Sequence, residues 1–409
     1  MNILFYGPLE VRNLGSFKVH IYEVVSNLSK LGHNIIPLST NASEDVSGID
    51  SKQLVSLWRR IKNTLRSSPI YELLKGEINI SWLFLKEIHI FFLAFVLVIR
   101  KRERVDVIYR RHSLFNSEYF LARLFRIPSV REVNGIIADE AKITKGGDNF
   151  SLQIIDRVER FSIRKADKII VVTPKLKEVL HNNYKVPRDK IVVIPNGVNT
   201  NLFRPIDQKE IKKDLGFDQD TNYICFVGSL IPWQGVEFLI RSAPLILKEH
   251  PKTKFLIVGD GPLKEELIEL AEKTGVSDKF IFTGAVPYEE VPKYINASDV
   301  CVVYKKPLRS GYSPLKLYEY MACGKPVVAS RVEGFEILEQ NKAGILVEPE
   351  NPEELAKAII KLLKDEGLRR ELGENGRKYV AKNHSWEAVA RKVAEVCKSV
   401  VVEHENKRR

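Results

Sequence analysis

The stretch GYSPLKLYEYMACGKPVVAS, from Gly311 to Ser330, runs from a glycine turn into a helix and then a strand. Pro314 suits the first turn of a helix, because a residue there needs no amide donor. The free amides that follow point out of the helix and, with the positive end of its dipole, favour an anion such as phosphate. Val327–Ser330 has the apolar character of a buried parallel strand. The segment predicts an α/β fold with an anion site at a helix tip.

Two charged residues extend this anion site. Lys316 adds a full positive charge close to the helix start. Glu319 lies one turn further along, where a carboxylate can accept hydrogen bonds from a pair of sugar hydroxyls. A phosphate site beside a hydroxyl acceptor is what a nucleotide-sugar requires.

Length and charge narrow the classes of protein. A chain of 409 residues is too long for one core and suits two domains. Lys and Arg (64) exceed Asp and Glu (52), a net charge of +12 that suits nucleotide diphosphates, acidic lipids or nucleic acid. The sequence has no zinc-finger spacing and no aromatic RNA-binding signature, so nucleic acid is the least favoured partner.

The cysteines and the N-terminal segment indicate a compartment. The four cysteines have no short paired spacing, which is typical of a reducing environment without structural zinc. The first residues form an apolar strand without a basic segment, so we expect no secretion signal. Both features predict a cytoplasmic protein.

Short apolar runs alternate with longer amphipathic segments, which predicts parallel sheets. A turn at Pro195–Gly197 marks the seam between two halves that each open with a strand ending in glycine. We predict an N-terminal acceptor domain at 1–198, a nucleotide-sugar domain at 199–375, and helices at 376–409 that cross back to the first domain. The predicted strands are Asn2–Tyr6, Asn34–Leu38, Val105–Tyr109, Ser129–Val133, Lys168–Val172, Ile191–Ile194, Tyr223–Val227, Lys254–Val258, Phe280–Thr283, Val300–Val303, Pro326–Ala329 and Gly344–Val347.

Two segments raise the question of a membrane. Ile88–Ile99 is apolar but shorter than the ~20 residues of a spanning helix, so we interpret it as a helix buried against the first sheet. Ser51–Arg66 has apolar residues at helical spacing among five cations and no acid. Such a helix can lie on an anionic bilayer or present an ordinary solvated basic face, and the sequence leaves both interpretations open.

The Gly311–Ser330 stretch resembles the donor-binding segment of the group-one glycosyltransferases, family four of the retaining glycosyltransferases. The resemblance extends from Asn2–Tyr6 to Ser385–Trp386. It implies a GT-B fold, in which two Rossmann-like domains with parallel sheets face each other across a cleft. It also implies retaining transfer of a hexosyl group from a UDP- or GDP-sugar to a hydroxyl of a glycan or lipid-linked acceptor, with no cofactor and no bound metal.

The resemblance implies a donor site drawn from several loops. The backbone near Gly284 and Val286, beside the turn at Gly259, would contact the base, although an ordinary strand-to-helix turn explains Gly259 equally well. Glu319 would bind the ribose. The residues expected at the diphosphate are Gly15, Ser229, Gln234, Ser313, Leu315 and Lys316. A plain helix start capped by Ser16 remains an alternative for the Gly15 segment.

The chain departs from the family's pattern in three ways, the first of which involves a pair of positions. Ser229 and Gln234 stand where many relatives have an Arg and a Lys on the diphosphate. Gly311 stands where relatives often have a glutamate, and Asn134 where they often have a histidine beside the sugar. The chain is then either a non-catalytic scaffold or a transferase that moved its charge to Lys316. We favour the transferase, because a buried diphosphate without cations is costly and because Pro-Leu-Lys recurs with Trp-Gln-Gly in a subgroup of these enzymes.

The acceptor side is expected at the strand ends of the first half, where open parallel sheets bind ligands. We predict catalytic roles for Lys316, Asn134 and Glu132, with Glu132 either a general base or a carboxylate paired with Arg131 or Arg110. The expected acceptor contacts are Arg110, His112 and Glu140. A dehydrogenase is the weaker rival, because Gly259–Gly261 opens the middle of a half-domain instead of its first strand.

Overall fold

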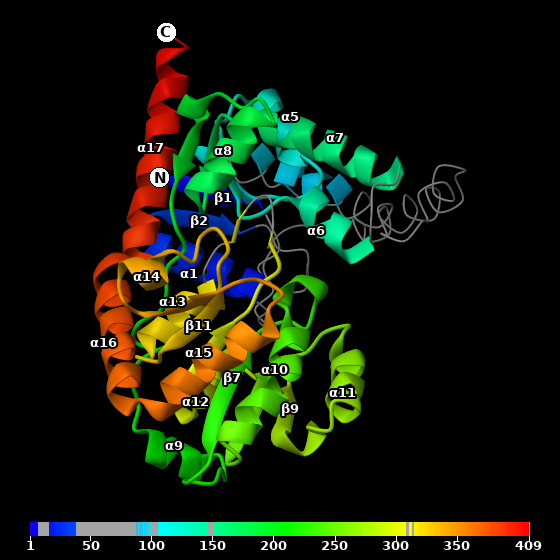
Figure 1. The fold of residues 1–409 in the computed structure, drawn as a ribbon. Coiled ribbons are helices and arrows are strands. Elements are labelled where there is room, and N and C mark those ends of the chain that lie inside the picture. Colours follow the sequence, from blue (N-terminus) through cyan, green and yellow to red (C-terminus); the bar gives the residue numbers. More distant parts are fainter. Residues whose placement is uncertain are drawn as a thin grey trace, which may run out of the picture.

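A computed structural model of the chain describes residues 1–6, 16–37, 87–88, 90–92, 94–96, 98–99, 105–145, 150–307, 311–312 and 315–408. Figure 1 shows two lobes, one above the other in this view, with the C-terminal helix running along the upper one. The predicted basic helix at 51–66 lies outside the described residues, as do Gly15, Ser313 and Pro314.

The first lobe contains a six-stranded sheet with the order β2-β1-β3-β4-β5-β6. Every neighbouring pair is parallel, as the apolar runs predicted. The strands are β1 (Asn2–Phe5), β2 (Asn34–Pro37), β3 (Val107–Arg111), β4 (Ser129–Val133), β5 (Lys168–Val171) and β6 (Ile191–Val193). β3 reaches Arg111, so Arg110 lies inside the strand and not at its end as we expected.

The second lobe repeats this plan with the order β12-β11-β10-β7-β8-β9, again all parallel. Its strands are β7 (Asn222–Val227), β8 (Thr253–Val258), β9 (Phe280–Gly284), β10 (Val300–Val303), β11 (Val327–Ser330) and β12 (Gly344–Val347). The twelve predicted strands and the prediction of two parallel Rossmann-like sheets are therefore confirmed.

Helices cover both sheets. Those of the first lobe are α1 (Ser16–Lys30), α5 (Ser117–Phe125), α6 (Ile137–Lys145), α7 (Phe150–Arg164) and α8 (Pro174–Asn182). Those of the second are α9 (Gln208–Asp214), α10 (Val236–Glu249), α11 (Lys264–Lys273), α12 (Val291–Ala297), α13 (Leu315–Ala322), α14 (Ile337–Gln340), α15 (Pro352–Lys364) and α16 (Glu366–Asn383), followed by α17 (Trp386–Asn406). Short 3-10 turns are η1 (Arg188–Lys190), η2 (Pro232–Gln234), η3 (Ser277–Lys279) and η4 (Tyr288–Glu290).

The start of α15 illustrates how the sequence specifies a helix. Asn351 precedes Pro352, and its side-chain oxygen accepts a 3.0 Å hydrogen bond from the amide of Glu354. The cap satisfies an amide that has no partner inside the helix, and the proline costs nothing at the first position. The local sequence Asn351–Glu354 therefore determines where α15 begins.

The chain crosses between the lobes twice at one place. The Val198 amide donates to the His384 carbonyl at 2.8 Å, and Val198 bridges Ser385 in parallel. Gly197 is required here, because a Cβ would lie 2.8 Å from the Trp386 ring. α17 then packs on α1 and on β3, β4 and β5 of the first lobe (Figure 1). α16 runs through our predicted boundary at 375/376 and ends at Asn383.

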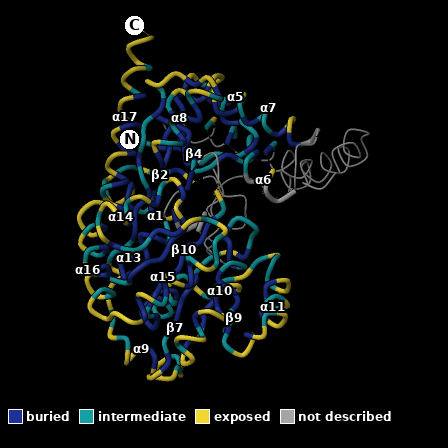
Figure 2. Tube along the Cα trace, viewed as in Figure 1, coloured by how far each residue is buried: buried dark blue, intermediate teal, exposed yellow. Residues whose placement is uncertain are grey.

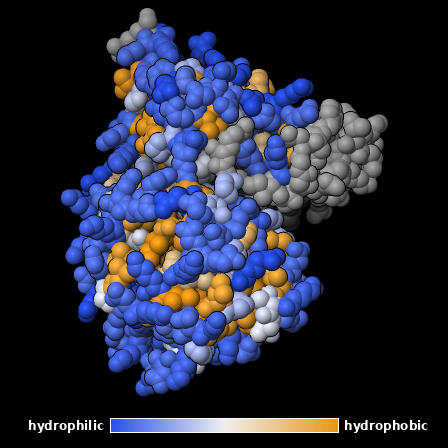
Figure 3. Space-filling view, in the orientation of Figure 1, coloured by the Kyte–Doolittle hydropathy of each residue, from blue (hydrophilic) through white to orange (hydrophobic). Residues whose placement is uncertain are grey.

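Buried apolar residues fill both sides of each sheet, and the exposed segments lie at the periphery (Figure 2). Within 87–99, Ile90 and Ala94 belong to the cluster of Leu4 and Ile108, which confirms a helix buried against the first sheet. The face drawn in Figure 3 is mainly hydrophilic, with small apolar groups between. In the part of the chain that the structure describes, no helix is long and apolar enough to cross a bilayer.

Candidate functional site

The start of α13 lies at the junction of the two lobes (Figure 1). Leu315, its first residue, packs against a cluster of the first lobe that includes Phe5, Ile21 and Trp386. The free amides at a helix start point away from the helix body. The end of α13 with the free amides is thus directed toward the opposite lobe, as a donor site between two domains would require.

Lys316 places its ammonium among neutral groups of the second lobe. Nζ donates a 2.9 Å hydrogen bond to the side-chain oxygen of Gln234 and lies 4.3 Å from the centre of the Phe226 ring. Gly228 makes room for it, because a Cβ at Gly228 would collide with the ammonium. Burial lowers the pKa of Lys316 to about 7, although the carboxylate of Glu319 opposes this shift. A half-buried cation with neutral contacts favours an anion beside it.

Glu319 lies one turn further along α13 and is buried. Its Oε1 accepts a 3.1 Å hydrogen bond from the hydroxyl of Tyr288, at the start of η4. Burial raises the pKa of Glu319 to about 7, while Tyr288 and Lys316 act in the opposite direction. A carboxylate that already accepts one hydroxyl has the chemistry to accept the hydroxyls of a ribose.

Glycines bring the ends of three strands into close backbone contact beside Lys316. The Gly259 amide donates to the Gly284 carbonyl at 2.9 Å, and a Cβ on Gly259 would collide with the Gly228 carbonyl. Gly228 and Gly259 have φ values of +145° and +142°, which side chains rarely adopt. Gly259 and Gly284 are thereby assembled next to the anion site. Val286 packs against the core of the same lobe.

The three departures from the family's pattern have distinct surroundings. Gln234 is buried and holds Lys316, whereas Ser229 is exposed. Gly311 has a φ of +66°, and a Cβ added there would lie 3.3 Å from the Glu333 carbonyl oxygen, so a glutamate there would be strained. Asn134 follows β4, and its buried Oδ1 has no hydrogen-bond partner among the described residues. A buried hydrogen-bond acceptor without a partner is energetically costly, so this oxygen suits a hydrogen bond from a hydroxyl or amide group of a ligand.

Glu132 is held by partners that we did not predict. His20 Nε2 lies 2.5 Å from Glu132 Oε1, and the Tyr109 hydroxyl donates to Oε2. Burial alone would raise the pKa of Glu132, but His20, Arg111 and Tyr109 lower it to about 2. A carboxylate kept this firmly ionised is a poor proton acceptor at neutral pH. The predicted pairing with Arg131 or Arg110 was wrong, because both arginines contact a different carboxylate, Glu118.

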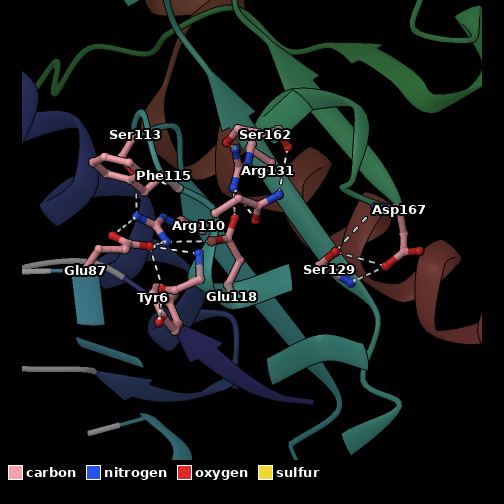
Figure 4. A network of polar contacts seen from close by, with 12 residues as sticks. Tyr6, Glu87, Arg110, Ser113, Phe115, Glu118, Ser129, Arg131, Ser162 and Asp167 are labelled. Atoms are coloured by element: carbon pink, nitrogen blue, oxygen red, sulfur yellow. Dashed lines mark hydrogen bonds and ion pairs between the residues drawn. The ribbon is translucent and has the colours of Figure 1, made fainter. Parts of the chain in front are cut away.

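Figure 4 shows where the arginines of β3 and β4 point. The Arg110 guanidinium bonds Glu87 at 2.5 and 2.8 Å and Glu118 at 2.5 Å. Arg131 reaches Glu118 as well, and both guanidiniums are buried. The donors of Arg110 are therefore engaged within the first lobe, and an acceptor role for Arg110 remains only a prediction.

The other two expected acceptor contacts differ in their surroundings. His112 Nε2 lies 2.8 Å from Glu159 Oε1, and Glu159 also accepts from the amides of Ile137 and Ala138 at the start of α6. Burial lowers the pKa of His112 despite the nearby Glu159 carboxylate. Glu140 lies within α6, but its side chain is outside the described residues. Both acceptor roles remain predictions.

Sequence reasoning missed Phe226 and Tyr288 at the donor site. A phenylalanine inside a strand has the pattern of a core residue, and no spacing links Tyr288 to a glutamate on a different helix. We also treated His20 as a structural histidine without naming its partner; the contact with Glu132 joins α1 to β4. In the described part of the chain, no three His, Cys, Asp or Glu side chains gather closely enough to share a metal ion.

Two lobes, each with a parallel sheet, and the start of α13 with Lys316 at their junction define a two-domain transferase of the GT-B type. A family model described as "Glycosyl transferases group 1" matches residues 207–379, and one described as "Glycosyltransferase Family 4" matches residues 18–202. An uncharacterized glycosyltransferase of Methanocaldococcus jannaschii is 31% identical over 293 residues, which cover 68% of this chain and 71% of that protein. The chain belongs to the group-one glycosyltransferases of family four.

A relative with a described substrate and two solved structures complete the comparison. The D-inositol 3-phosphate glycosyltransferase of Corynebacterium diphtheriae is 29% identical, over 72% of this chain and 70% of its own length. Sucrose-phosphate synthase of Thermosynechococcus elongatus matches with a TM-score of 0.76 at 20% identity, covering 98% of this chain and 99% of that structure. HepE of Anabaena, in complex with UDP-glucose, has a TM-score of 0.71 at 19% identity and covers 98% of this chain and all (100%) of its own. The two structures establish the GT-B fold.

Proposed function

We propose that this glycosyltransferase moves a hexosyl group from a nucleotide diphosphate sugar to a hydroxyl of a glycan or lipid-linked acceptor, with retention of anomeric configuration. The observation that carries the proposal is the placement of Lys316 and Glu319 one turn apart near the start of α13, whose first residue, Leu315, packs against the first lobe. The Lys316 ammonium suits the diphosphate, and the Glu319 carboxylate suits the ribose. The crystallised complex of HepE with UDP-glucose supports a UDP-sugar as the first donor to test, with a GDP-sugar as the second.

The proposed donor site assigns one task to each group. The amides at the start of α13 and the Lys316 ammonium bind the diphosphate, together with Gly15, Ser313, Ser229 and Gln234. Glu319 accepts the ribose hydroxyls, and the backbone near Gly284 and Val286 contacts the base. Stabilising the charge of the departing diphosphate is the main catalytic task, and prearranged amides and a buried cation supply it effectively. We propose that no metal ion is needed, which unchanged transfer in EDTA would support.

The acceptor proton is proposed to leave through a diphosphate oxygen on the same face of the sugar. This route fits a Glu132 that stays ionised beside His20 and is a poor base. Asn134 then contacts the sugar with its unpartnered oxygen. Closure of the lobes about the crossing at Val198 and His384 excludes water from the donor. We place the enzyme in the cytoplasm, at the inner face of the membrane that carries its acceptor.

The neutral Ser229 and Gln234 favour one alternative, a non-catalytic GT-B protein that binds a nucleotide-sugar or partners another transferase. Melting with UDP, GDP and ADP comes first, because a ligand that binds the folded state raises the melting temperature. Radiolabelled sugars of the stabilising nucleotide are then incubated with the protein. Transfer or slow hydrolysis of the donor supports the enzyme, and binding without any turnover supports the alternative. No stabilisation by any of these nucleotides contradicts both.

A further inference from the structure

The outer side of α5 and α7 exposes large apolar residues that the described part of the lobe leaves uncovered. Phe120 and Leu124 of α5 are 60% and 61% exposed, and Phe161 of α7 is 54% exposed. Burial of such side chains is favourable, so their exposure in three neighbouring places requires an explanation. We call this surface the α5/α7 face; its residues are Phe120, Arg123, Leu124, Ile154, Arg157, Phe161, Arg164 and Lys165.

Helical spacing produces the face. Phe120 and Leu124 are four residues apart on α5, and Ile154, Phe161 and the arginines between and after them recur every three or four residues on α7. Residues at these spacings share one side of a helix. The solvent side of α7 therefore alternates apolar and cationic side chains.

Specific contacts join the two helices into one surface. The Asn116 side chain, before α5, donates to the Ser162 carbonyl of α7 at 2.9 Å. The Lys165 ammonium lies 5.4 Å from the centre of the Tyr119 ring and 5.0 Å from that of Phe161. Tyr119 in turn lies edge-on to Phe120, with ring centres 5.5 Å apart. α5 and α7 are neighbours at the top of the first lobe in Figure 1.

The charge of the face is strongly one-sided. α5 and α7 contain three acidic residues, and each is already paired. The pairs are Glu118 with Arg110 and Arg131, Asp156 with Arg160, and Glu159 with His112. Arg123, Arg157 and Arg164 remain exposed on the surface. A depression of about 410 Å³ opens beside the C-terminal half of α7. It is lined by Arg157, Arg160, Phe161, Arg164 and Lys165. Several cations around one aromatic ring suit a phosphate group held at an apolar boundary.

We infer that the α5/α7 face docks this protein on an anionic membrane. Aromatic and aliphatic ends would enter the boundary between headgroups and acyl chains, and the arginines would pair with lipid phosphates. A protein partner would have to supply an acidic and apolar surface of matching shape, whereas a membrane offers lipid phosphates and an acyl boundary together. Here cations lie between the apolar residues on successive helical turns. The inference goes beyond the proposed transfer reaction and does not depend on the identity of the donor.

Flotation with vesicles tests the inference on the full chain. Phosphatidylcholine vesicles with and without phosphatidylglycerol are compared at ~50 mM salt, where charges are weakly screened. Two paired variants change the face: Phe120→Ser with Phe161→Ser, and Arg157→Glu with Arg164→Glu. The matched control is Arg241→Glu with Leu245→Ser, which changes an exposed cation and an exposed apolar residue on α10 of the second lobe.

We expect the parent protein and the α10 control to float only with phosphatidylglycerol. Each α5/α7 variant should lower the vesicle partition coefficient by roughly tenfold or more, since each surface cation contributes roughly fivefold. Unchanged melting temperatures show that the variants are folded. If the parent does not float, the inference is overturned and an acidic protein becomes the better partner for the face. If the parent floats and the α5/α7 variants float equally well, the membrane contact lies elsewhere and the inference is again wrong.

Discussion

The ammonium of Lys316 and the side-chain oxygen of Gln234 are 2.9 Å apart, so the cation of α13 is held by a residue of η2, in the loop between β7 and α10. The family resemblance implies a lysine in many relatives where this chain has Gln234. The two positions are therefore adjacent in space, although they are far apart in the sequence. A charge lost at residue 234 can thus be supplied at residue 316 and still lie within the same site.

Lys316→Met should lower kcat/KM by roughly 10²–10³-fold, the range found when one donor to a developing negative charge is removed. Lys316→Arg should retain more activity, because it keeps the charge. Lys306→Met is the matched control: Lys306 also lies over a phenyl ring, that of Phe238, but is paired with Glu237 at 2.8 Å. Initial rates with a labelled donor provide the measurement. Parental rates for Lys316→Met would remove Lys316 from the site.

Lys316 and Glu319, one turn apart on α13, should give the ligand-free protein a stability minimum near neutral pH. The pKa of Glu319 is raised to about 7 from 4.5, so the folded state keeps a proton that the unfolded state loses, and stability falls as pH rises through this interval. The pKa of Lys316 is lowered to about 7 from 10.5, so the folded state gives up a proton that the unfolded state keeps. Stability then rises from about pH 7 to 10.5.

The check is the melting temperature across this pH range for the parent and for Lys316→Met with Glu319→Gln. The double variant has neither titrating group, so the difference between the two proteins should be largest near pH 7. A difference that stays constant with pH would mean that water reaches both groups in the folded protein. Saturating nucleotide should shrink the minimum, because bound phosphate favours the charged lysine and ribose hydroxyls favour the charged carboxylate.

Arg110→Met separates a structural role from an acceptor role. The change leaves Glu87 and Glu118 as buried carboxylates with one cation fewer, which should cost roughly 3–5 kcal/mol of folding free energy. Adding Glu87→Gln should recover part of the loss, since it removes one of the unpaired charges. Denaturant unfolding and acceptor KM are measured together. A raised KM at unchanged stability would instead identify Arg110 as an acceptor ligand.

The sequence predicted the sheets well because buried parallel strands are short apolar runs that end at turns, such as Tyr223–Gly228. It predicted the α13 anion site because a proline, a lysine and a glutamate are spaced along one helix start. It could not predict how Glu132 is used. Its partners His20 and Tyr109 come from α1 and β3, and only the packing of these elements selects them over the neighbouring Arg131.

Gly228→Ala should weaken nucleotide binding by more than the backbone strain of an alanine at this position accounts for. Gly228 and Gly216 both have positive φ, at +145° and +67°, so the backbone strain of an alanine at either position costs roughly 1–3 kcal/mol. A Cβ added at Gly216 would have no contact within 4 Å, whereas a Cβ added at Gly228 would meet the Lys316 ammonium. Displacing that ammonium by about 1 Å can cost roughly 10²-fold, because the cation then misses the diphosphate. Calorimetric titration of both variants with the stabilising nucleotide measures the difference, and equal losses at the two glycines would show that Gly228 does not position Lys316.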